Sequence, residues 1–93
     1  MIEVRVREEV MDFLRKLPPE PRHVLRQAIK DLRHERGDIR ALTDDLDGFC
    51  RLRVGSYRVI FEYEMIGGKR TATCVFAGSR RWVYEAFQSR LME

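Results

Sequence analysis

Residues 51–63 read RLRVGSYRVIFEY, and this stretch decides the fold. Gly55-Ser56 is a typical two-residue hairpin turn, and apolar and polar residues alternate on both sides of it. The stretch therefore predicts two antiparallel strands. Its charge needs an explanation, because Arg51, Arg53 and Arg58 all fall within the first eight positions.

A two-residue turn fixes which residues face each other across the hairpin. Arg53 is then opposite Arg58, and Cys50 is opposite Phe61. One face, predicted to be the core face, has Cys50, Leu52, Val54, Tyr57, Val59, Phe61 and Tyr63. The other face has Arg51, Arg53, Arg58 and Ile60.

A third strand is predicted over 69–77, joined to strand 57–65 by the turn Gly67-Gly68. The simplest register pairs Phe61 with Cys74, Ile60 with Val75 and Arg58 with Ala77. A small residue opposite Arg58 predicts a depression beside the arginines. The chain then turns at Gly78.

Like charges facing each other across two strands repel, by roughly 0.2–1 kcal/mol if cross-strand pair energies apply. An anion bound among them would remove this cost, and the planar fork of arginine suits phosphate. The turn after 69–77 brings Arg80, Arg81 and Tyr84 to the same edge. We interpret this cluster as an anion site, with a solvated charged face, offset by Glu62 and Glu64, as the alternative.

The rest of the chain predicts a single α+β domain over residues 1–93. Residues 2–6 alternate as a strand does, and two amphipathic helices follow, one ending near Leu17 and one ending at Gly37. Residues 38–48 are predicted to be a loop. Val83, Phe87 and Leu91 have the spacing of a short closing helix. No repeat or second domain is visible.

The net charge of +3 is unevenly distributed. Residues 49–84 have seven Lys or Arg against Glu62 and Glu64, a local net of +5, while the flanking segments are each near −1. A basic block in a balanced chain indicates a local site. There is no apolar run of about 18 residues that could span a membrane, and the alternating N-terminus does not resemble a signal peptide. We therefore expect a cytoplasmic protein.

Other chemistry is sparse. Cys50 and Cys74 would flank Phe61 at about 10 Å, beyond the ~7 Å limit for a disulfide, so both are predicted to be buried free thiols. His23 and His34 have no neighbour at metal-ligand spacing. We expect no metal and no cofactor.

The runs DIRALTDDLDGFCRLRVGSYRVIFEY (38–63) and VFAGSRRWVY (75–84) resemble the RelE/ParE superfamily of bacterial toxin–antitoxin toxins. The helical segment FLRKLPPEPRHVLRQAIKDL (13–32) also fits, so the resemblance covers nearly the whole chain. It implies an N-terminal strand, an α-helical hairpin, a three-stranded antiparallel meander and a short C-terminal helix. The N-terminal strand would complete a four-stranded antiparallel sheet.

RelE-like members cleave messenger RNA in the ribosomal A site without a metal. The RNA 2′-hydroxyl attacks the adjacent phosphate and leaves a 2′,3′-cyclic phosphate. By this resemblance Arg51 and Arg53 are basic site residues, Arg58 clamps the scissile phosphate, and Arg80 is the arginine after the G-x pair. Tyr84 is the tyrosine that stacks on or activates the nucleotide.

The resemblance implies a cognate antitoxin, encoded by an adjacent gene, that neutralises the toxin. Ser79 stands where many members have histidine, so catalysis would depend on the arginines, with Tyr84 as base. ParE-like members share the fold but inhibit DNA gyrase. An mRNA endoribonuclease is thus the leading hypothesis, and a gyrase inhibitor or an inactive antitoxin-binding homologue is the alternative.

Overall fold

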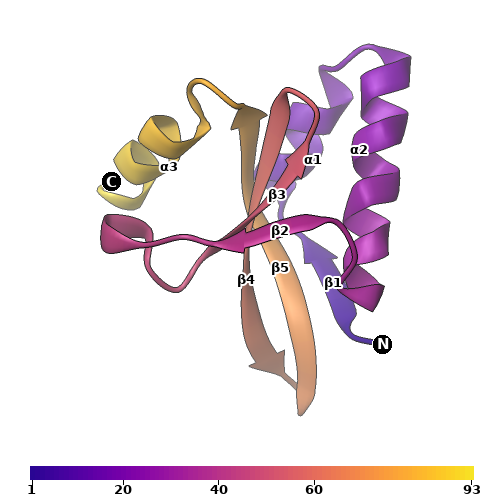
Figure 1. Cartoon of the computed structure of the whole chain (residues 1–93), viewed down its shortest axis with the longest axis vertical. Helices are drawn as coiled ribbons and strands as arrows, with labels where there is room; N and C mark the ends of the chain where they lie inside the picture. The colour runs from indigo at the N-terminus through magenta and orange to yellow at the C-terminus, as the bar shows by residue number, and fades with distance from the viewer.

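The computed structural model describes all residues, 1–93, as one mixed five-stranded sheet with helices on both faces (Figure 1). The strands are β1 (Glu3–Val6), β2 (Asp38–Ala41), β3 (Cys50–Val54), β4 (Tyr57–Ile66) and β5 (Lys69–Ser79). The helices are α1 (Glu8–Arg15), α2 (Pro19–Asp31) and α3 (Val83–Leu91), with 3-10 turns at Leu32–His34 and Asp44–Leu46. The strand order is β1-β5-β4-β3-β2.

The main core lies between the sheet and the helical hairpin of α1 and α2 (Figure 1). Its buried members are Val10, Leu14, Leu25, Ile29, Leu32, Leu52, Val59, Phe61, Ala72, Cys74 and Ala77. All seven residues predicted for the core face of the β3–β4 hairpin lie in this cluster or pack against it. The predicted inward face of the hairpin is therefore confirmed.

The two predicted helices form, although α2 ends at Asp31 and not at Gly37, because a 3-10 turn follows it. Pro18 disfavours helix before it, while Pro19 lies in the first turn of α2, where no amide hydrogen is needed. Arg22 joins the two helices, since its guanidinium donates to the carbonyl oxygens of Leu14 at 3.2 Å and Leu17 at 2.7 Å. The Leu14 carbonyl also accepts from the Leu17 amide at 3.1 Å, so these bonds hold the connection after α1 against the first turn of α2.

Two features of the predicted sheet are wrong. The N-terminal strand pairs with β5 in parallel, so the sheet is mixed and not antiparallel throughout. The segment predicted to be a loop, 38–48, contains β2, which pairs antiparallel with β3 and adds a fifth strand. β2 is only four residues long, and Ile39 is its only side chain that packs against the main core. The sequence of β2 therefore lacks the alternation of apolar and polar residues that would have indicated a strand.

The β3–β4 register is as predicted, with Arg53 opposite Arg58 and Cys50 opposite Phe61. Gly55 has a φ of 59°, as the first central residue of a type II′ turn requires. Between β4 and β5, Phe61 pairs with Cys74 as predicted, but a bulge at Val75 shifts everything beyond it by one residue.

The bulge corrects two predicted pairs. Ile60 faces Phe76 and not Val75, and Arg58 faces Gly78 and not Ala77. A bulge adds one residue to one strand, and the alternating pattern of β5 gives no sign of it. The small residue opposite Arg58 is therefore the glycine.

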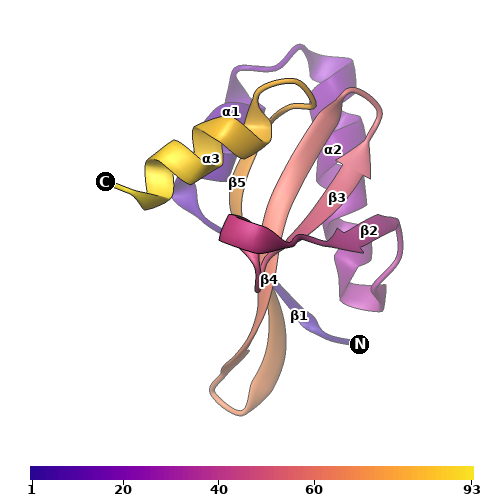
Figure 2. The ribbon, with the colours of Figure 1, turned by 60° about the vertical axis from the view of Figure 1, so that its left-hand side comes forward.

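A second apolar cluster covers the other face of the sheet, beneath α3 (Figure 2). Its buried residues are Leu46, Ile60, Val75, Val83 and Phe87. Phe87 packs edge-on against Phe49, with ring centroids 5.0 Å apart. The face that the sequence assigned to arginines is therefore apolar in its middle, and its charges lie around that cluster.

Both cysteines are free thiols, as predicted, but only Cys74 is buried and Cys50 is half-buried. Burial raises the pKa of Cys74 from the ordinary value of 9.0 to about 12. Above pH 9 the thiol of the unfolded chain ionises while the folded thiol stays protonated, so the unfolded state binds fewer protons. We therefore expect this group alone to lower the free energy of unfolding by about 1.4 kcal/mol in total between pH 8 and pH 10.

Urea unfolding at pH 8 and pH 10 in reductant measures this effect. Other groups also titrate in that range, so Cys74→Ala is the control, and it should lose less stability than the native protein over the same interval. An identical pH dependence in the two proteins would contradict the prediction.

Candidate functional site

Two neighbouring strands bring arginines together at the end of the sheet near the β3–β4 turn. Arg53 on β3 lies directly opposite Arg58 on β4. Across the other side of β4, Arg58 faces Gly78 of β5, which has no side chain. The register thus leaves open space on one side of Arg58 and a like charge on the other.

Arg58 is half-buried and held by the turn. Its Nη1 donates to the carbonyl oxygens of Gly55 and Tyr57, each at 2.9 Å. Those two bonds use the hydrogens of Nη1, so the Nε–H and the two hydrogens of Nη2 have no partner within the chain. This edge of the guanidinium is the fork that takes a phosphate or carboxylate in two parallel hydrogen bonds.

The turn after β5 brings two more arginines to the same end. The Arg80 amide donates to the Ser56 carbonyl oxygen at 2.8 Å, so the β5–α3 turn is bonded to the β3–β4 turn. Figure 2 shows these two connections beside each other at the top of the sheet. Arg80 and Arg81 are both exposed.

We call the set Arg53, Arg58, Arg80 and Arg81 the arginine cluster. None of its members takes part in an ion pair within the chain. The nearest acid by register is Asp38, which lies opposite Arg53 on β2 but binds a different arginine. Four unneutralised guanidinium groups at one end of a sheet favour a polyanionic ligand.

Arg51 differs from the cluster. It is only 9% exposed, and its Nη1 donates to the Asp38 carbonyl at 2.8 Å and the Asp38 carboxylate at 3.1 Å. A buried arginine bonded in this way connects β3 to β2 and has its charge balanced by its partner. The predicted phosphate contact of Arg51 stays a prediction, and in this conformation the guanidinium binds Asp38.

Ser79 is the last residue of β5, directly before Arg80, and Tyr84 lies in the first turn of α3. Ser79 pairs with Tyr57 across the sheet, next to Arg58. The half-buried Tyr84 ring packs against the second apolar cluster. Both histidines lie in the α2 region on the opposite side of the sheet, so no imidazole reaches the arginine cluster.

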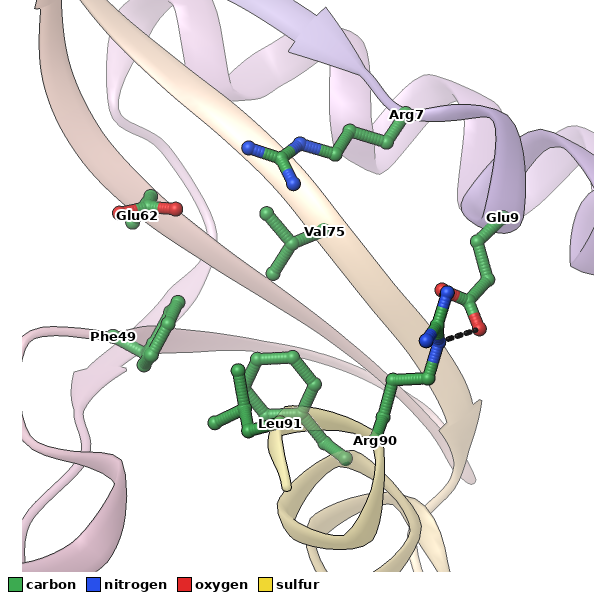
Figure 3. A pocket seen from close by; sticks show the side chains of 8 residues that line it. Arg7, Glu9, Phe49, Glu62, Val75, Arg90 and Leu91 are labelled. Atoms are coloured by element: carbon green, nitrogen blue, oxygen red, sulfur yellow. Dashed lines mark hydrogen bonds and ion pairs between the residues drawn. The ribbon is translucent and has the colours of Figure 1, made fainter. Parts of the chain in front are cut away.

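A hollow of about 300 Å³ lies at the other end of the same face, under the C-terminal end of α3 (Figure 3). Phe49, Val75, Phe87 and Leu91 form its apolar wall, and Arg7, Glu9, Glu62 and Arg90 its polar wall. Arg90 donates from Nε to Glu9 at 3.1 Å and closes one side. Because the hollow has both signs of charge, it lacks the single-sign character of the arginine cluster.

Sequence reasoning found the arginine cluster but not the hollow. The hollow depends on residues from opposite ends of the chain, because Arg90 near the C-terminus pairs with Glu9 near the N-terminus. One signal in the sequence was Ile60, an apolar residue between Arg58 and Glu62 on the same face of β4, which indicates that another element packs on that face.

The three helices are all too short and too polar to span a membrane.

Two solved structures have a similar fold. A chain in the toxin–antitoxin complex RelBE2 from Mycobacterium tuberculosis matches with a TM-score of 0.72 and 24% identity, over 85% of this chain and 98% of that one. A chain in the RelB–RelE antitoxin–toxin complex from Methanococcus jannaschii matches with a TM-score of 0.61 and 18% identity, over 89% and 98%. No protein-family model matches this chain, and neither does any curated protein. The likeness shows the fold.

Proposed function

We propose that this protein is the toxin of a toxin–antitoxin pair and acts as a ribosome-dependent mRNA endoribonuclease. The arginine cluster is the observation that carries the proposal, because four unpaired guanidinium groups fit an RNA backbone. Support also comes from the fold, which is similar to that of chains in RelB–RelE complexes.

The proposed reaction is attack by an RNA 2′-hydroxyl on the adjacent phosphorus. The P–O bond to the next nucleotide breaks, leaving a 2′,3′-cyclic phosphate and a free 5′-hydroxyl, and no water or metal enters the step. Arg58 binds the phosphate through its free Nε and Nη2 edge, and Arg53 and Arg80 stabilise the extra negative charge of the transition state.

Proton transfer falls to the tyrosine in this proposal. Arginine has a pKa above about 12 and cannot act as a base near neutral pH. Tyr57 is next to Arg58 in sequence, but its ring packs against Phe13 on the core face. The proposal therefore assigns the proton to Tyr84 at the start of α3, because Ser79 supplies only a hydroxyl. The rate therefore depends more on charge stabilisation than on a strong base.

Ribosomes programmed with a defined mRNA test the proposal directly. Adding the protein should produce a discrete cut within the A-site codon, with a 2′,3′-cyclic phosphate at the new 3′ end. Intact mRNA after prolonged incubation, together with normal growth of cells that express the protein, would overturn the nuclease role.

The lack of an imidazole near the arginine cluster favours one alternative. A gyrase inhibitor of the ParE kind needs a basic surface but no proton-transfer group, and both histidines of this chain lie across the sheet. A DNA supercoiling assay separates the two functions. Inhibition of gyrase with no mRNA cleavage would assign the alternative, and inhibition of neither would indicate an inactive antitoxin-binding homologue.

The proposed partner is a cognate antitoxin that lies across the helical hairpin. A groove of about 210 Å³ between α1 and α2 has Val6, Met11, Leu14 and Ile29 along its floor and Arg26 and Lys30 at its edge. Neither basic residue forms an ion pair within the chain. This chemistry fits an amphipathic segment with acidic side chains beside its apolar ones.

A further inference from the structure

We propose that Trp82 is a base-stacking residue, which holds an RNA nucleobase beside the phosphate bound by the arginine cluster. This inference rests on the proposed RNA ligand and adds a binding group to the same site. The Trp82 side chain is 62% exposed, although tryptophan is the largest apolar side chain in the sequence.

The backbone holds Trp82 at the edge of the arginine cluster. Its amide donates to the Ser79 carbonyl at 3.1 Å, and its own carbonyl accepts from the Ala86 amide at 2.9 Å. Ser79 in turn pairs with Tyr57, the residue next to Arg58. Trp82 is therefore fixed at the start of α3, within one hydrogen-bonded turn of the strand end that faces the arginines.

No side chain of this protein covers the indole ring by stacking. Trp82 belongs to none of the four aromatic pairs, and the single cation–π contact is between Arg70 and Tyr63. It also lies outside both apolar clusters, unlike Val83 next to it. An exposed indole without an intramolecular partner is a surface available to a ligand, since it has both an apolar face and a polar N–H.

The surrounding charge favours a nucleobase over an apolar protein segment as that ligand. Arg80 and Arg81 directly precede Trp82, and Glu85, one turn further along α3, is the nearest acid in sequence. Alternating cations and aromatic rings follow the alternating phosphates and bases of a single strand, and each stacked base contributes about 1–3 kcal/mol. At a protein–protein interface we would instead expect the tryptophan ring to lie among other exposed apolar side chains.

The test uses the fact that this chain has one tryptophan. Titration with a short single-stranded RNA, 2′-O-methylated to prevent cleavage, should quench the fluorescence of Trp82, whereas tripolyphosphate should bind with little quenching. Binding of the same oligonucleotide with a fluorescent label, at low salt, should be weakened about 5- to 150-fold in Trp82→Leu. Trp82→Phe should keep most of the affinity, and tripolyphosphate should bind all three proteins equally.

Arg58→Ala separates this inference from the proposed function, because it should weaken both RNA and tripolyphosphate. If Trp82→Leu binds RNA as tightly as the native protein while Arg58→Ala does not, the stacking role is overturned and the arginine site stands. If the native protein binds neither ligand, the RNA site itself fails. Loss of a protein partner in Trp82→Leu with unchanged RNA binding would assign Trp82 to a protein interface and overturn the inference.

Discussion

Arg58→Ala is expected to lower the rate of mRNA cleavage on programmed ribosomes by about 10²–10³-fold, the usual cost of removing one donor from a charge-stabilising site. The guanidinium has one edge bonded to the Gly55 and Tyr57 carbonyls and one edge free for the phosphate. Replacing Arg58 with alanine removes both edges of the guanidinium. The carbonyls lie at a partly exposed turn and can bind water, so the fold should persist.

Arg58→Lys keeps the charge but not the two-pronged fork, and its rate should fall between those of the native protein and the alanine variant. Arg33→Ala is the control, since Arg33 also forms no ion pair but is exposed and lies beyond α2, on the other side of the sheet. Cleavage by Arg58→Ala at the native rate, with circular dichroism unchanged, would contradict the proposed mechanism.

Phe61→Ala should destabilise the protein by about 3–5 kcal/mol, a large fraction of the stability of a domain of this size. The Phe61 ring is fully buried in the main core and packs edge-on against Tyr63, with centroids 5.3 Å apart. Truncation removes this packing and leaves a cavity between the sheet and the helical hairpin. Urea unfolding followed by far-ultraviolet circular dichroism measures the loss.

Met65→Ala provides the comparison on the same strand. The side chain of Met65 is 67% exposed, so its removal should change the free energy of unfolding by less than about 0.5 kcal/mol. If Phe61→Ala proves too unstable to purify, Phe61→Leu should show a smaller loss in the same direction. A Phe61→Ala protein as stable as Met65→Ala would contradict the position of the core.

The hairpin at Gly55 could be predicted because its information is local. A two-residue turn and a period of two fix the register of β3 and β4, and the pairing of Arg53 with Arg58 follows directly. The helical hairpin was equally readable, since its prolines and apolar spacing lie within one segment.

The errors have non-local causes. The direction of β1 is set by its pairing with β5, far along the chain, and its own alternation is the same in either direction. The bulge at Val75 and the short strand β2 form only in pairing with neighbouring strands, and their own sequences have no distinct pattern. Such features depend on tertiary packing.

The site was only partly readable for the same reason. Periodicity placed Arg51 on the same face as Arg53, but it could not show that Asp38, on a strand taken for a loop, binds one of them and not the other. The sequence did not indicate Trp82 as a site residue. Trp82 directly precedes Val83, which is buried, and the sequence alone does not show that the tryptophan side chain is exposed while its neighbour is not.

The position of β5 has a consequence for synthesis of the chain. Glu3 pairs with Thr71, 68 residues later, so the first strand to leave the ribosome has no partner until most of the protein has been made. The connection between Arg80 and Ser56 forms later still. An unfinished chain therefore has no assembled arginine cluster, and the proposed RNA binding should begin only after the chain has been completed and released.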